Sequence, residues 1–331
     1  MTKTSLQVQV EEWPLAKPFV IARGSKTQAH VVTVTLSQDG KAGRGECVPY
    51  ARYGESTNSV TAQIEAVRVA IEGGMNHSEL QQAMPAGAAR NALDCALWDL
   101  EAKLAGKSVY EMLGREMPAS MPSVQTVSIS SPAQMRAEAA ALSTFPVIKI
   151  KLDAEDVLAR IEAVHAGAPA AKLIIDANES WSVALLGEVA PALAKLGVVM
   201  VEQPVSAGSD AQLAGYSGPV PLGADESCHT SADLVRLKGL YNFINIKLDK
   251  TGGLTEALNM QAKARDMGFG IMVGSMVSTS LALAPAVLLA LDADFVDLDS
   301  PNLLAKDRPY AMKLAAGRLS GIDTALWGGG G

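Results

Sequence analysis

The segment VIKIKLD, residues Val147–Asp153, has the pattern of a short buried β-strand. Its apolar residues alternate with Lys149 and Lys151, and because successive strand side chains point to opposite faces, both ammonium groups lie on one face. Alone, this segment is most typical of a half-exposed strand whose cationic face is solvated. The rest of the chain favours another interpretation, because the later strand-like runs also end in polar residues.

Short apolar runs alternate with helix-like segments from residue 124 onward, and this alternation predicts a parallel sheet covered by helices. Eight runs have strand character: Val124–Ile129, Val147–Lys151, Leu173–Asp176, Val198–Glu202, Val220–Asp225, Phe243–Lys247, Ile271–Ser275 and Phe295–Asp299. Eight successive βα units favour a TIM-type barrel over an open doubly wound sheet. No GxGxxG motif follows a strand, which weakens a nucleotide-binding interpretation.

The N-terminal part of the chain has a different pattern. Alternating apolar residues within residues 4–46 predict an antiparallel sheet, and the proline-containing segment Trp13–Ser25 inside it is expected to be a loop. Helical segments follow, the first of which Ser56 is suited to cap. The fold class is therefore α/β, with an α+β domain over residues 1–115 and a (β/α) barrel over residues 116–304.

Composition and charge exclude several classes of protein. Of the 331 residues, 48% are hydrophobic and 19% are charged, which indicates a globular chain. The net charge of −7 and the lack of a Lys/Arg-rich run argue against nucleic-acid and membrane partners. The most apolar run, Leu281–Leu291, contains Pro285 and is too short to span a bilayer.

The expected location is the cytoplasm. The N-terminus lacks the apolar core of a signal peptide. The three cysteines, Cys47, Cys95 and Cys228, are far apart and odd in number, which fits a reducing compartment. We expect them to be small buried apolar residues.

A candidate polar residue stands at or near the end of each strand-like run from the second onward. These residues are Lys151, Asp176, Glu202, Asp225, Lys247, Ser275 and Asp297. Their separations are 25, 26, 23, 22, 28 and 22 residues, each the length of one βα unit. In a barrel, this register gathers all seven side chains at the C-terminal mouth, where barrel active sites lie.

Asp176, Glu202 and Asp225 follow three successive strands, so their carboxylates are expected to converge. Clustered anions repel one another unless a cation joins them, and ligation by oxygen atoms alone suits Mg²⁺, with Mn²⁺ as a substitute, better than Zn²⁺. The alternative is that the three acids independently cap the helices that follow.

Lys151 precedes the three acids by one strand and Lys247 follows them by one, so they can approach a bound substrate from opposite sides. A lysine acts as a general base only if its pKa is lowered, and both Lys149 and a divalent cation would lower it. Lys149 is also a candidate ligand of a substrate carboxylate. Such a site suits removal of an α-proton, and its return to the opposite face would invert the centre. Alone, Lys247 could equally be an ordinary loop charge.

At this point the chain resembles the enolase superfamily, muconate-lactonizing subgroup, over nearly its whole length. The matching motifs are ALDCALWDLEAKLAG, KIK at Lys149, DANESW at Asp176, VEQP at Glu202, ADES at Asp225 and NIKLDKTGGLTEAL around Lys247. The resemblance implies a capping domain on a modified barrel, with residues 305–331 returning to the cap. It also implies Mg²⁺ on the three acids and acid/base roles for Lys151 and Lys247.

Subgroup members differ mainly in substrate, and here the eighth strand is informative. DFVDLDSP places Asp297 and Asp299 on one face, where two carboxylates would bind a substrate ammonium. This pattern resembles dipeptide epimerases of the L-Ala-D/L-Glu type, as do PFVIARGS and PYARYGES. The resemblance implies that Arg23 meets a glutamyl carboxylate and that Thr126 and Ser275 line the pocket. Arg23 could instead be an exposed charge, and Asp299 could cap the next segment.

The sequence therefore predicts a Mg²⁺-dependent isomerase that inverts the C-terminal residue of L-Ala-D/L-Glu, with a role in murein peptide recycling. The alternatives are an epimerase of another dipeptide, an N-acylamino acid racemase, or a non-catalytic binding barrel. The last alternative does not explain why lysines and acids stand in register. The sequence leaves open whether the chain forms a homo-oligomer.

Overall fold

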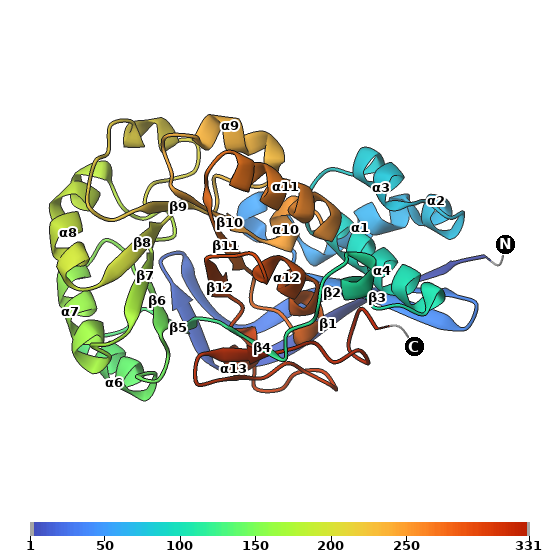
Figure 1. The fold of residues 1–331 in the computed structure, drawn as a ribbon, viewed down its shortest axis with the longest axis horizontal. Helices are drawn as coiled ribbons and strands as arrows, with labels where there is room; N and C mark the ends of the chain where they lie inside the picture. The colour runs from blue at the N-terminus through green and yellow to red at the C-terminus, as the bar shows by residue number, and fades with distance from the viewer. Residues whose placement is uncertain (1–2, 330–331) are drawn as a thin grey trace.

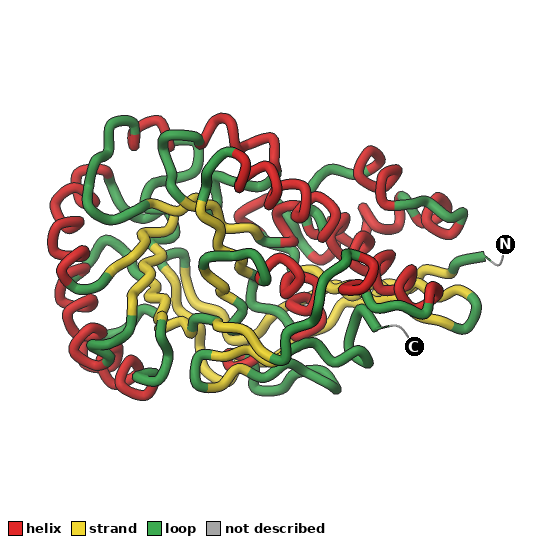
Figure 2. Tube along the Cα trace, in the orientation of Figure 1, coloured by secondary structure: helices red, strands yellow, loops and turns green. Residues whose placement is uncertain are grey.

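The computed structural model describes residues 3–329, and a barrel of parallel strands forms one side of the molecule (Figure 1). Its strands are β5 (Gln125–Val127), β6 (Val147–Lys151), β7 (Lys172–Asp176), β8 (Val198–Glu202), β9 (Leu222–Ala224), β10 (Phe243–Ile246), β11 (Gly270–Gly274) and β12 (Phe295–Asp297). Each is hydrogen-bonded to its neighbours in chain order. Figure 2 shows these strands inside a layer of helices.

The barrel sheet nearly closes on itself. The amide of Val124, just before β5, donates to the carbonyl oxygen of Val296 on β12 at 2.9 Å. The Ser123 hydroxyl also accepts from the amide of Leu298 at 3.3 Å. These bonds join the two edge strands and confirm the predicted TIM-type barrel.

Helices connect the barrel strands and cover the outside of the sheet. They are α6 (Pro132–Ala141), α7 (Val157–Gly167), α8 (Val183–Lys195), η2 (Asp210–Leu213), η3 (Ser231–Asp233), α9 (Leu234–Leu237), α10 (Leu248–Thr251), α11 (Leu254–Asp266) and α12 (Ser280–Ala290). One further helix, α13 (Ser300–Leu303), follows the last barrel strand and contacts the N-terminal strand Ser5–Ile21. Strands β8 and β9 are connected only by the short η2, so the barrel is modified there. No helix among residues 3–329 is both long and apolar enough to cross a membrane.

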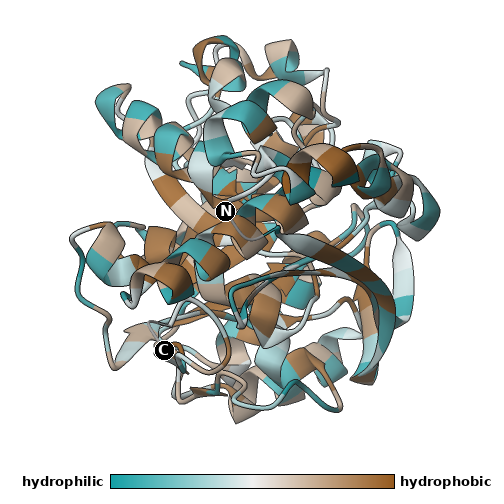
Figure 3. Ribbon diagram, turned by 90° about the vertical axis from the view of Figure 1, so that its right-hand side faces the viewer, coloured by the Kyte–Doolittle hydropathy of each residue, from teal (hydrophilic) through white to brown (hydrophobic). Residues whose placement is uncertain are grey.

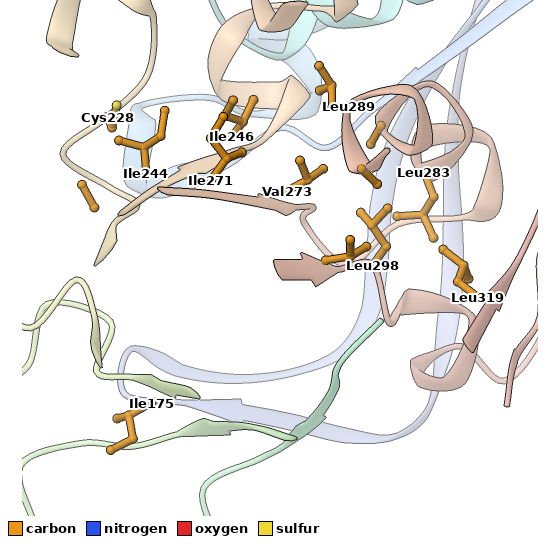
Figure 4. Close-up of a cluster of buried hydrophobic side chains, with 14 of the residues drawn as sticks. Ile175, Cys228, Ile244, Ile246, Ile271, Val273, Leu283, Leu289, Leu298 and Leu319 are labelled. Carbon is orange, nitrogen blue, oxygen red and sulfur yellow. The ribbon is translucent and has the colours of Figure 1, made fainter. Parts of the chain in front are cut away.

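The apolar core lies between the barrel strands and the helices. Ile175, Ile244, Ile271 and Val273 point outward from their strands toward it (Figure 4). Leu283 on α12 meets the same cluster, and α12 is buried along its whole length. Figure 3 shows hydrophobic segments through the centre of the molecule and hydrophilic ones toward its outside. Burial of this surface supplies the main driving force for folding.

The N-terminal part combines an antiparallel sheet with helices. The sheet order is β1 (Ser5–Ile21), β2 (Gly24–Gln38) and β3 (Lys41–Cys47). The helices are η1 (Ala51–Tyr53), α1 (Thr57–Ala66), α2 (Arg68–Glu72), α3 (His77–Ala83), α4 (Ala88–Ala105) and α5 (Val109–Met112). Ser56 caps α1 as predicted, because its hydroxyl accepts from the amide of Ser59.

The segment predicted as a loop at Trp13–Ser25 is instead largely strand, and that prediction was wrong. β1 runs through Pro14 and Pro18 to Ile21, with a break in register between Pro14 and Phe19. β1 is an edge strand, so a proline on its open side removes no ladder bond. The long β1–β2 hairpin therefore extends across the molecule to the barrel (Figure 1).

The end of the chain returns to the N-terminal part. β14 (Arg318–Ser320) pairs with β13 (Leu314–Ala315) and with β4 (Ser120–Pro122). Beyond it, the Trp327 indole donates to the carbonyl of Cys95 on α4 at 3.1 Å, and the amide of Gly328 donates to Asp99 at 2.6 Å. The exact domain boundaries stay a prediction, and residues 330–331 lie outside the described residues.

Strand β3 approaches helix α4 closely because it carries glycine where a side chain would collide. A Cβ atom on Gly45 would lie 2.0 Å from the carbonyl oxygen of Ala92 and 2.8 Å from the amide of Ala96. Gly43 is equally tight against α4. The absence of side chains therefore sets the spacing of sheet and helix in the N-terminal domain.

We predict that Gly45→Ala lowers the midpoint of thermal unfolding, because overpacking of this kind costs about 1–3 kcal/mol. Gly187→Ala is the matched control. Gly187 lies within α8, and a Cβ atom added to it would have no atom within 4 Å apart from its chain neighbours and the backbone of its own helix. Because glycine in a helix interior is about 1 kcal/mol worse than alanine, that change should raise the midpoint. An unchanged midpoint for Gly45→Ala would contradict the close-approach argument.

Candidate active site

A cavity of about 490 Å³ opens at the C-terminal ends of the barrel strands, beneath the tip of the β1–β2 hairpin and the segment 49–53. Nine of the predicted site residues line it: Arg23, Thr126, Lys149, Lys151, Asp225, Lys247, Ser275, Asp297 and Asp299. Asp176 and Glu202 are fully buried and contact the lysines of the cavity. The structure thus brings all eleven predicted residues to one place.

The three acids converge as the spacing predicts. One carboxylate oxygen from each of Asp176, Glu202 and Asp225 lies within 4.8 Å of the others. Burial and the negative charge of Asp176 raise the pKa of Glu202 to about 7, although Lys149 opposes this. Burial also acts to raise the pKa of Asp225, but Lys247 and Lys250 outweigh it and hold that pKa well below its ordinary value. A buried, all-oxygen donor set with an incompletely compensated carboxylate fits a divalent cation.

Lysine side chains compensate these acids. Lys149 Nζ lies 2.6 Å from Glu202 Oε2, 2.6 Å from Asp297 Oδ2 and 3.1 Å from Asp176 Oδ2. Lys151 Nζ lies 2.5 Å from Asp176. Lys149 is almost completely buried, so this charged group is held inside the barrel by its three carboxylate partners.

The pKa of Lys247 departs from the sequence-based expectation. Its ammonium lies 2.6 Å from Asp225. Burial lowers the pKa of Lys247, but Asp225 and Glu202 together raise it above the ordinary value of lysine, and the opposing effect of Lys149 is smaller. The carboxylates therefore dominate over the neighbouring lysine. A cation among these acids would reduce their effect and favour the neutral, basic form of Lys247.

A buried glutamine holds the loops that carry two of the acids. Gln203 follows Glu202 with a φ of 37°, an uncommon conformation for a residue other than glycine. Its Oε1 accepts from the amides of Asp225 at 2.9 Å and Ser227 at 3.1 Å. This strained residue therefore fixes the backbone of one acid directly beside the other.

Asp299 does not cap the segment that follows it. Its backbone stands at the start of α13, but its side chain makes no capping hydrogen bond there. Its Oδ2 accepts instead from the Thr126 amide at 2.7 Å and from Gln125 at 3.2 Å. Burial and the nearby Asp297 raise the pKa of Asp299 to about 6. Asp297 and Asp299 thus form a close acidic pair in the cavity wall.

Arg23 is not an unpaired surface charge, because residues of the chain already bind its guanidinium. Its guanidinium lies 2.6 Å from Glu226 Oε1 and 3.2 Å from Glu179 Oε2, and it donates to the Tyr50 hydroxyl at 3.0 Å. The arginine therefore joins the hairpin tip to the barrel loops. Its predicted contact with a substrate carboxylate stays a prediction.

Sequence reasoning missed Lys26, Asn245, Lys250 and Glu226. Asn245 shares the inward face of its strand with Lys247, so the i, i+2 spacing could have identified it. Lys250 was visible in the NIKLDKTGG motif only as a loop charge. Lys26 lines the cavity with its Nζ 4.9 Å from the Tyr50 ring centre, and within residues 3–329 no carboxylate forms an ion pair with it. Only the hairpin fold brings it there.

Comparisons with known proteins agree with this architecture. Residues 3–114 match the mandelate racemase / muconate lactonizing enzyme N-terminal domain, and residues 133–305 match the enolase C-terminal domain-like family. The chain belongs to the enolase superfamily. This confirms the family resemblance drawn from the sequence.

Several relatives in this superfamily cover almost the whole chain. The L-Ala-D/L-Glu epimerase of Escherichia coli is 48% identical over 95% of this chain and 99% of its own length. An N-acetyl-D-glutamate racemase of Pseudoalteromonas is 47% identical over 90% of this chain and 95% of its own length. This enolase-superfamily chain is therefore an enzyme, and specifically an isomerase.

One solved structure is very similar in fold. It is an enolase family member from Agrobacterium tumefaciens with homology to dipeptide epimerases, determined with bound sodium and L-Ala-L-Glu. It is 47% identical, covers 98% of this chain and 100% of its own, and has a TM-score of 0.96. A dipeptide epimerase from Enterococcus faecalis, complexed with Mg and L-Leu-L-Tyr, is 28% identical with a TM-score of 0.91 and covers 99% of each chain.

Proposed function

We propose that this chain is a divalent-metal-dependent epimerase that inverts the α-carbon of the C-terminal residue of L-Ala-D/L-Glu. The observation that carries the proposal is the position of its two candidate bases. Lys151 ends β6 and Lys247 directly follows β10, and these strands are four apart in the eight-stranded ring. The two lysines therefore stand across the cavity from each other.

Two bases on opposite sides suit the removal of a proton from one face and its return to the other. One lysine, in its neutral form, accepts the α-proton of the glutamyl residue. The other, as an ammonium, donates a proton from the opposite face, so the configuration is inverted. Each isomer uses the two lysines in reversed roles.

Asp176, Glu202 and Asp225 are the residues that would hold the cation, which we propose to be Mg²⁺. When bound, such an ion neutralises negative charge that develops on the substrate carboxylate. The Lys149 ammonium, held by Asp176, Glu202 and Asp297, adds a fixed positive charge beside the same carboxylate. The α-proton becomes more acidic as a result.

Two features of the cavity support a dipeptide with a free amino terminus and an acidic C-terminal residue. The Asp297 and Asp299 carboxylates offer partners to a substrate ammonium. At the hairpin tip, Lys26 offers a positive charge that no carboxylate of residues 3–329 neutralises, close to the guanidinium of Arg23. Thr126 and Ser275 also line the cavity.

A second candidate is racemisation of an N-acylated glutamate. The near-equal identity to the N-acetyl-D-glutamate racemase favours it. Both candidates share the lysines and the acidic side chain of the substrate, and they differ only in whether an ammonium is present. Roles in murein peptide recycling, Mn²⁺ as a substitute, a cytoplasmic location and homo-oligomer formation stay predictions.

We predict that Lys151→Ala and Lys247→Ala each lower the rate of L-Ala-L-Glu epimerisation by at least about 100-fold, since general acid–base catalysis contributes 10²–10⁴-fold. Proton NMR in D₂O with Mg²⁺ measures both the L,D diastereomer and exchange of the glutamyl α-proton. Each variant should retain exchange with only one of the two diastereomers. Wild-type epimerisation rates in either variant would refute the two-base scheme.

We predict that Asp297→Asn lowers kcat/KM for L-Ala-L-Glu much more than for N-acetyl-L-Glu, because only the dipeptide has an ammonium. Lys149 acts on both substrates in this scheme. Any displacement of Lys149 by the substitution therefore changes both kcat/KM values alike and leaves their ratio unchanged. If both values fall by the same factor, Asp297 does not bind an ammonium.

Lys26→Met is expected to reduce the preference for L-Ala-L-Glu over L-Ala-L-Gln by about 10- to 100-fold, the factor equivalent to a hydrogen bond to a charged group. The rate with L-Ala-L-Gln should stay near that of the unmodified enzyme. Lys17→Met is the matched control, because Lys17 lies on the neighbouring strand of the hairpin as an exposed partner of Glu138. An unchanged Glu/Gln preference in Lys26→Met would contradict the assignment.

A further inference from the structure

Lys250 is a buried ammonium that is excluded from the cavity and fully occupied by the chain itself. Its Nζ donates to Asp225 Oδ1 at 2.6 Å, to the carbonyl of Asp225 at 2.7 Å and to the carbonyl of Asn245 at 2.7 Å. An ammonium has three donors, so all of them are used. Asp225 Oδ2 is left facing Lys247 at 2.6 Å. Lys250 therefore occupies one oxygen of this acid, and the other oxygen faces Lys247 at the cavity.

Asn245 likewise occupies one oxygen of the neighbouring acid, Glu202. Its Nδ2 donates to Glu202 Oε1 at 2.6 Å, while Glu202 Oε2 faces Lys149. The opposite amide orientation would bring two acceptors together. On the adjacent strand, a Cβ atom on Gly274 would lie 2.7 Å from the Asn245 amide oxygen. The glycine makes room for this amide beside the acid.

The third acid, Asp176, also has one oxygen bound by the chain, in this case by a backbone amide. Asp176 Oδ1 accepts from the amide of Asn178 at 3.0 Å, and Oδ2 contacts Lys151. All three carboxylates thus have one oxygen bound to a donor that does not line the cavity or to a backbone amide, whereas the other oxygen contacts a lysine that lines the cavity. Such a cluster would offer a cation one oxygen from each acid and no bidentate carboxylate.

Single oxygen ligands suit some cations better than others. Mg²⁺ requires a near-ideal octahedron and binds few carboxylates through one oxygen each, whereas Ca²⁺ takes six to eight oxygens and accepts bidentate carboxylates. We propose that Asn245 and Lys250 are positioning residues that restrict Glu202 and Asp225 to one oxygen each and thereby make the site select a small octahedral cation over Ca²⁺. This inference rests on the metal site in the proposed function.

The test is calorimetric titration of the metal-free full-length chain with Mg²⁺ and with Ca²⁺. The variants are Asn245→Leu, which removes one donor at similar volume, and Lys250→Met, which removes the ammonium but keeps the length of the side chain. Each should lower the ratio of Mg²⁺ to Ca²⁺ affinity by at least about tenfold, which is the lower end of the loss in metal affinity caused by changes to outer-shell partners of metal ligands. Broadened Mn²⁺ EPR lines relative to the unmodified protein should accompany this loss.

Gln261→Leu is the matched control, because Gln261 is equally buried and donates to the carbonyl of Leu289 outside the site. It should lower the unfolding midpoint and leave the affinity ratio unchanged. A ratio that stays at the unmodified value in Asn245→Leu overturns the inference, whether or not Lys250→Met folds. No Mg²⁺ binding by the unmodified chain would instead overturn the proposed metal site itself.

Discussion

The site depends on mutual compensation of buried charges at the carboxyl ends of the barrel strands. Removing an ion from water is costly, and breaking a buried pair leaves an uncompensated charge. Here four lysines meet four acids: Lys149, Lys151, Lys247 and Lys250 with Asp176, Glu202, Asp225 and Asp297. These lysines differ in which groups they contact. Lys250 is satisfied entirely by the chain, whereas Lys151 and Lys247 border the cavity and can meet a substrate.

The N-terminal domain supplies the other half of the cavity. The β1–β2 hairpin reaches the barrel mouth, where Arg23 pairs with Glu226, and where Lys26 lies over the Tyr50 ring without an ion pair to any carboxylate of residues 3–329. The close packing of β3 on α4 sets the base from which this hairpin extends. Under the proposed function, the barrel would carry the chemistry and the cap would contribute the charge that meets the substrate side chain. Relatives with different substrates can therefore share one set of catalytic groups.

Much of the site could be predicted because its residues recur along the chain at the spacing of the βα units. One polar residue per βα unit is a signal in the sequence, and a closed ring of parallel strands has only one carboxyl end at which those residues can meet. The strand at Val147–Lys151 and that at Val198–Glu202 have the predicted bounds. The ladders of β10 and β12 end before the predicted runs do, because the chain turns into the short helices α10 and α13, at whose starts Lys247 and Asp299 stand.

The sequence by itself determined the barrel, its cap and the identity of the converging lysines and acids, because alternation and spacing are local properties of the chain. Only the tertiary structure decided which partners those groups have. The proline-containing strand β1 was misread because its edge position is invisible in sequence. Three features depend on contacts between residues far apart in the chain, and no local pattern encodes such distances. They are the pairing of Arg23 with Glu226, the position of Lys26 over the Tyr50 ring, and the different partners of the two oxygens of Asp225.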